Sequence, residues 1–110
     1  MTMQHVQEIE TKKYNGWTNY ETWAVNLWLG NDKGNYTYWQ ERAAYWKTAK
    51  STSEYWSQAE SATFNLADEL EQAFKDNQPE TVNGTVYADL LNAALSEVNW
   101  HEIAEGLLTD

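Results

Sequence analysis

The sequence predicts an all-α protein, folded as a compact bundle of about five helices. Apolar residues recur at spacings of three and four over long stretches, as one face of an α-helix requires. Between these stretches stand the Ser, Thr, Asn and Pro residues that commonly begin or end helices. The chain has 110 residues, the size of one domain. Because residues 1–13 show no steady period, we expect a flexible N-terminal arm there and a single helical domain over residues 14–110.

The first expected helix covers residues 19–29. Thr18 is a suitable N-cap, and Glu21 stands three residues later, which completes the pattern of a capping box. Gly30 is expected to end this helix, because glycine readily takes the left-handed conformation that follows many helices. Since the segment is apolar nearly all round, we expect it to lie centrally in the fold.

The second expected helix follows a polar turn over residues 31–35 and ends near residue 50. Its first residue is expected between positions 35 and 37. Trp39, Ala43 and Trp46 give this helix an apolar face at spacings of four and three.

The third expected helix is the longest and covers residues 52–76. Ser51 with Glu54 repeats the capping-box pattern at its start, and Pro79 closes the segment that follows it. One bent helix that continues through residues 51–53 is the alternative.

Two shorter helices complete the bundle. Residues 81–86, around an Asn-Gly pair, predict either a minimal β-hairpin or a structured loop. A well-formed amphipathic stripe predicts a fourth helix over residues 86–98. Asn99 then caps a fifth helix, in which Glu102 stands at the third position.

Charge is distributed unevenly along the chain. The formal net charge is −10, and residues 1–50 carry six basic and five acidic side chains. Residues 51–110 carry twelve acidic side chains and a single basic one, Lys75, a net of −11. This half repels polyanions and attracts basic surfaces, so we expect no direct binding of nucleic acid and no membrane association. Plain solubility is the alternative explanation of the acidic surface.

Several kinds of chemistry have no support in the sequence. The chain has no Cys, which excludes disulfides, thiolate metal sites and Cys nucleophiles and fits the cytoplasm. It also lacks a glycine-rich phosphate loop and a nucleophile elbow. Glu97, His101 and Glu105 share a helical spacing, but a break at Asn99 separates the first from the others. We therefore expect no metal, no cofactor and no enzymatic activity.

Two sets of residues are candidates for recognition. The first is an acidic face on the third helix, for binding a host protein with a basic surface: Glu60, Asp68, Glu69, Glu71 and Asp76. The second is a polar and aromatic patch in the N-terminal half: Asn15, Asn19, Tyr20 and Asn26. The seven Trp and seven Tyr residues suit a small core of large side chains, although some rings can instead form a binding surface.

The string Tyr-Asn-Gly-Trp-Thr-Asn-Tyr-Glu-Thr-Trp over residues 14–23 is distinctive. With residues 25–32 behind it, it resembles a family of small uncharacterised proteins found mostly in phages, plasmids and bacterial or archaeal genomes. Residues 87–100 look similar to the C-terminal part of that family. The resemblance implies a mobile-element context and no particular chemistry.

The leading hypothesis is therefore a small acidic, non-enzymatic interaction protein of a mobile element. Its sharpest form is inhibition of a host nucleic-acid-handling or defence protein by the acidic C-terminal half, through partial mimicry of DNA. A ligand- or peptide-binding module that uses the aromatic N-terminal half is the first alternative. A structural homo-oligomer is the second.

Overall fold

The all-α class is confirmed by a computed structural model, which describes residues 14–51 and 56–109. The expected arm over residues 1–13 lies outside these ranges. Within them the chain forms five α-helices and one short 3-10 turn: α2 (Tyr20–Asn31), α3 (Lys33–Thr48), α4 (Gln58–Asp76), η1 (Glu80–Val82), α5 (Val86–Glu97) and α6 (Trp100–Thr109).

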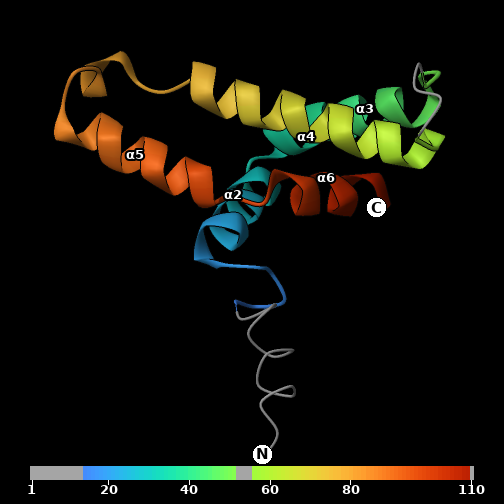
Figure 1. Cartoon of the computed structure of the whole chain (residues 1–110), viewed down its shortest axis with the longest axis horizontal. Helices are drawn as coiled ribbons and strands as arrows, with labels where there is room; N and C mark the ends of the chain where they lie inside the picture. Colours follow the sequence, from blue (N-terminus) through green and yellow to red (C-terminus); the bar gives the residue numbers. More distant parts are fainter. Residues whose placement is uncertain (1–13, 52–55, 110) are drawn as a thin grey trace, which may run out of the picture.

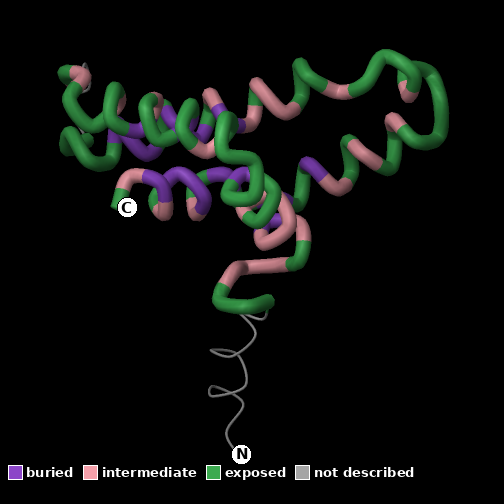
Figure 2. The backbone as a smooth tube through the Cα atoms, turned by 180° about the vertical axis from the view of Figure 1, so that it is seen from behind, coloured by how far each residue is buried: buried purple, intermediate pink, exposed green. Residues whose placement is uncertain are grey.

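The bundle is built around α4 and α6, which pack against each other, while α3 lies against both (Figure 1). α2 crosses the end of this layer and contacts α3, α5 and α6. α5 diverges from α4 after the η1 turn, so that its N-terminal part stands away from the central layer (Figure 1). Figure 2 shows the buried residues on the facing sides of α4 and α6 and the exposed start of α5.

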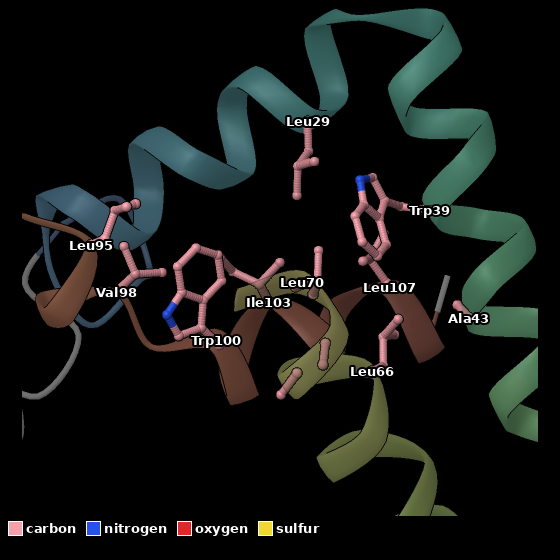
Figure 3. Close-up of a cluster of buried hydrophobic side chains, with 12 residues drawn as sticks. Leu29, Trp39, Ala43, Leu66, Leu70, Leu95, Val98, Trp100, Ile103 and Leu107 are labelled. Carbon is pink, nitrogen blue, oxygen red and sulfur yellow. The ribbon is translucent and has the colours of Figure 1, made fainter. Parts of the chain in front are cut away.

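All five described α-helices contribute residues to the core (Figure 3). Leu66 and Leu70 of α4 and Ile103 of α6 are fully buried. Leu29 enters from α2 and Trp39 from α3. Burying one such aliphatic side chain contributes about 1.5–3 kcal/mol, so these contacts supply the main driving force for assembly.

The start of α2 differs from the expectation by one residue. Asn19, not Thr18, is the N-cap, and its side chain accepts a hydrogen bond from the backbone N–H of Thr22 at 2.9 Å. The N–H of Thr18 donates instead to the carboxylate of Glu102 at 3.1 Å, so Thr18 joins the segment before α2 to α6.

Gly30 does not end α2, which continues to Asn31. The expected five-residue turn is reduced to Asp32, whose extended backbone ends α2 and begins α3. Its side chain accepts a hydrogen bond from the N–H of Asn35 at 3.0 Å. A carboxylate at this position stabilises the N-terminus of α3, so the helix starts at Lys33, earlier than expected.

α4 starts at Gln58, six residues later than expected, and α3 and α4 are separate helices. The capping box is formed by Ser57 and Glu60 in place of Ser51 and Glu54. Residues 52–55, which include Glu54, lie outside the described ranges. Ser51 packs beside the helix, where its N–H donates to the side-chain oxygen of Gln58 at 2.9 Å.

Of the two alternatives for residues 81–86, the structured loop is confirmed and the hairpin is absent: the segment includes the end of the η1 turn and Gly84, whose φ is +73°. The flanks of two residues are too short to hold a ladder. A small β-type turn forms elsewhere, at Tyr14–Trp17, with two backbone hydrogen bonds. Asn15 and Gly16 both have positive φ there, as a type I′ turn requires.

The buried side of α2 is not the most apolar one. Thr22 is fully buried and Leu29 nearly so, whereas Tyr20, Leu27 and Trp28 are exposed. Thr22 is accommodated because its hydroxyl is hydrogen-bonded. The fifth helix starts as expected, since Asn99 accepts a hydrogen bond from the N–H of Glu102 at 3.0 Å.

Candidate functional site

The five carboxylates of the expected acidic face all lie on α4, but most of them have partners within the chain. Glu60 completes the capping box by accepting from the N–H of Ser57 at 2.9 Å. Glu71 forms an ion pair with Lys75 at 3.0 Å, and Asp76 accepts from the amide of Gln72 at 2.9 Å.

Glu69 is the most strongly held of the five. Its two oxygens accept from Arg42 Nε at 2.8 Å and from Trp46 Nε1 at 2.7 Å, which joins α3 to α4. The Arg42 guanidinium also lies 4.6 Å from the centre of the Tyr45 ring. This cluster shows that the surface of α3 and α4 can hold a guanidinium between a carboxylate and aromatic rings.

Asp68 differs from the other four, because it is exposed and no described residue pairs with it. It lines a hollow of about 610 Å³ between α3 and α4, together with Tyr38, Trp39, Glu69, Glu71, Gln72, Ala73 and Lys75. A second hollow of about 510 Å³ shares Tyr38, Trp39 and Ala73 with the first and is completed by Leu29, Asn35, Phe74 and Asn77. We call the two together the α3–α4 groove.

The α3–α4 groove combines aromatic rings with carboxylates. Tyr38 is half exposed, and its ring meets that of the buried Trp39 edge to face, with centroids 5.0 Å apart. Asp68 is the carboxylate of its lining that no described residue pairs with, whereas Glu71 is paired with Lys75, which lines the same hollow. A Lys or Arg side chain gains from both features, because a cation is attracted by an aromatic face and by a carboxylate. The groove therefore has the chemistry for a basic side chain of another molecule.

The polar and aromatic patch is spread over different environments. Asn15 lies in the tight turn before α2, and Asn19 caps α2 while its amide donates to the carbonyl of Glu97 at 2.7 Å. Tyr20 joins an exposed ring cluster, with its centroid 5.1 Å from that of Tyr14. Asn26 lies farther along α2 and lines a separate cavity. Two of the four residues thus have structural roles.

Sequence reasoning assigned no recognition role to Tyr38 and Trp39. Both belong to the predicted second helix, and Trp39 was correctly expected in its apolar face. Which α4 residues lie opposite them depends on how the two helices pack, and this is not encoded in either segment alone. A Tyr-Trp pair occurs three times in the sequence, at residues 38–39, 45–46 and 55–56, so the pair alone did not single out this site.

The described residues contain no group of three or more His, Asp or Glu side chains arranged to hold a metal ion. His101 and Glu105 lie 3.9 Å apart on α6, while Glu97 belongs to α5. In the part of the chain that the structure describes, every helix is too short or too polar to cross a membrane.

The model of a family of unknown function (DUF7249) matches residues 10–104. Neither the curated proteins nor the solved structures gave a match.

Proposed function

This chain belongs to the DUF7249 family, and we propose that it is a small non-enzymatic protein that binds a basic surface of another protein. The observation that carries the proposal is the α3–α4 groove, where the exposed carboxylate of Asp68 lies in the same hollow as Tyr38 and Trp39. The net charge of −11 over residues 51–110 adds a long-range attraction toward a basic partner.

The groove supplies the specificity that net charge lacks. A negative field raises the rate at which any basic protein approaches, while a ring and a carboxylate in one hollow favour a cation in a defined position. We infer that one Lys or Arg of the partner enters the groove and that the remaining acidic side chains steer its approach.

The sharper form of the proposal concerns the partner. We propose that the protein belongs to a mobile element and inhibits a host protein that handles nucleic acid or acts in defence, because such proteins carry basic surfaces. α4 has five carboxylates in 19 residues, or about one per 6 Å at the α-helical rise. Duplex DNA has one charge per ~1.7 Å, so the likeness to DNA is partial and confined to a short patch.

The proposal is tested by capture of partners from a lysate of the organism that carries the gene. The full chain is immobilised and washed at about 0.05 M and at about 0.5 M salt, since surface charges are screened over ~10 Å at 0.1 M. Retained proteins are identified by mass spectrometry. A variant with Tyr38→Ala, at a half-exposed ring, is run in parallel.

We expect one basic protein that is retained by the native chain at low salt, is released at high salt, and is lost from the Tyr38→Ala variant. Retention that does not depend on salt contradicts an electrostatic interface. Equal retention by both chains contradicts the groove as the binding site, and absence of any basic protein contradicts the proposed function.

A further inference from the structure

A second cavity neighbours the α3–α4 groove, since Leu29 lines both. It has a volume of about 390 Å³, within the range of small-molecule sites. Its lining comes from α2, α3, α6 and the segment before α2: Trp17, Asn26, Leu29, Gly30, Tyr36, Gly106 and Leu107. None of these side chains is charged.

Gly30 has no backbone reason to be glycine. It is the last residue but one of α2, which ends at Asn31, and its φ is not positive. A Cβ at this position meets nothing within 4 Å. A glycine inside a helix is less favourable than alanine. Alanine is thus compatible with the fold at this position, and Gly30 lines the cavity.

Gly106, in a second helix, also lines this cavity. It lies within α6, and an added Cβ would stand 3.6 Å from the Trp17 ring, an ordinary van der Waals contact. Two helices therefore each place a glycine at one cavity, at some loss of helix stability, although neither position forbids alanine. A requirement for open space explains both residues.

The remaining lining shows which ligand fits. Trp17 and Tyr36 line the cavity with aromatic side chains, and aromatic side chains can stack on planar rings. No described residue pairs with the side-chain amide of Asn26, which can donate and accept at once. This is how Asn pairs with the edge of a purine.

We propose that this cavity binds the purine base of a free nucleoside. A nucleotide is disfavoured, because the cavity is lined by no cation to pair with a phosphate and the chain carries a net charge of −10. The site does not depend on the α3–α4 groove, so it stands independently of the proposed protein partner.

Calorimetric titration of the full chain with adenosine and with guanosine tests the site, with adenosine monophosphate as the charged comparison. We expect saturable binding of at least one nucleoside, and binding of the monophosphate at least tenfold weaker. Absence of heat for both nucleosides at millimolar concentration, or equal affinity for the monophosphate, overturns the proposal. N-acetyl-tryptophanamide serves as a model of a protein side chain, and binding of it in preference to the nucleosides also overturns it.

Gly30→Ala is the decisive variant, because it is expected to raise the melting temperature and to weaken nucleoside binding at least tenfold. Gly34→Ala is the matched control: Gly34 lies in α3 and does not line the cavity, so binding is expected to be unchanged. Asn26→Leu, which removes the amide at similar size, is expected to abolish the preference between the two purines. Unchanged binding in Gly30→Ala contradicts the site. Capture of a basic protein is expected to persist in this variant, which separates the two proposals.

Discussion

The hydroxyl of Thr22 accepts a hydrogen bond from the backbone N–H of Asn99 at 2.9 Å, across 77 positions of the chain. The same hydroxyl donates to the side-chain oxygen of Asn19 at 2.6 Å. Asn19 in turn donates to the carbonyl of Glu97 at 2.7 Å. The N-terminal cap of α2 is thereby fastened to the corner between α5 and α6, and Thr22 is fully buried in this position.

Replacing Thr22 by Val is expected to destabilise the protein by about 1–3 kcal/mol, although the two side chains have nearly the same shape. The variant leaves the partly buried N–H of Asn99 without its partner, and an unpaired donor that is shielded from water carries a desolvation penalty. Chemical denaturation measures the free energy of unfolding. Thr22→Ser, which keeps the hydroxyl, is the control and is expected to lose less stability than Thr22→Val. The reverse order would show that the methyl group, not the hydrogen bonds, matters at this site.

The ion pair of Arg42 and Glu69 is expected to be a stronger link than that of Lys75 and Glu71. The first joins two helices, is less exposed, and shares Glu69 with the indole N–H of Trp46. The second lies within one turn of α4 and is more exposed. Double-mutant cycles of unfolding free energy should give a coupling of about 1 kcal/mol or more for the first pair and about 0.3–0.5 kcal/mol for the second. Equal couplings would contradict this distinction.

Gly16→Ala is expected to destabilise the protein by about 1–2 kcal/mol, because Gly16 has a φ of +88° and a side chain is strained there. Space is not the cause, since an added Cβ meets nothing within 4 Å. Gly30→Ala provides the contrast, since open space without positive φ predicts a gain in stability. Thermal unfolding of both variants measures the difference. If Gly16→Ala unfolds at the native temperature, the turn at Tyr14–Trp17 does not contribute to the folded state.

Substitutions in the apolar stripe of α5 are expected to affect stability strongly at its buried end and weakly at its exposed start. Leu95 is buried, so Leu95→Ala should destabilise the protein by about 2–5 kcal/mol. Leu90 is 62% exposed, and Leu90→Gln should change the unfolding free energy by less than about 0.5 kcal/mol. Sedimentation of the native chain over a range of concentrations tests the homo-oligomer alternative. If mass rises with concentration and Leu90→Gln prevents the rise, the exposed start of α5 is an interface between copies.

The sequence was sufficient to predict where the helices lie, but not where each helix ends or which residues of other helices it contacts. Apolar periodicity located all five helices, since burial of one face is a local property of a segment. The N-cap residues of α2 and α4 differ from the expected ones, because more than one nearby residue has a side chain that suits the N-cap position. Thr18 and Asn19 both qualify before α2, and Ser51 and Ser57 both stand three residues before a Glu. Packing decides between such candidates.

The two Asn-Gly pairs show the same limit. At residues 83–84 a hairpin and a structured loop were both open and the loop formed, while the β-type turn formed at residues 15–16. Local turn chemistry is alike at both places, and the surrounding structure differs. The candidate sites were less predictable still, because Glu69 meets Arg42 and Asp68 neighbours Tyr38 only after α3 packs on α4. Gly30 was expected to end the first helix, but α2 continues to Asn31 and its C-cap is Asp32.

The most direct measurement of the proposed function compares two charge reversals against the captured basic protein. Asp68→Lys lies in the α3–α4 groove, and Glu97→Lys lies at the end of α5 away from it. Both positions are exposed, and each reversal changes the net charge by +2, from −10 to −8. We expect the dissociation constant to rise at least tenfold for Asp68→Lys, which corresponds to about 1.4 kcal/mol, and to change less than about threefold for Glu97→Lys, because a charge away from the contact mainly affects the approach. Equal effects of the two reversals, or no effect of Asp68→Lys, would contradict recognition through the groove.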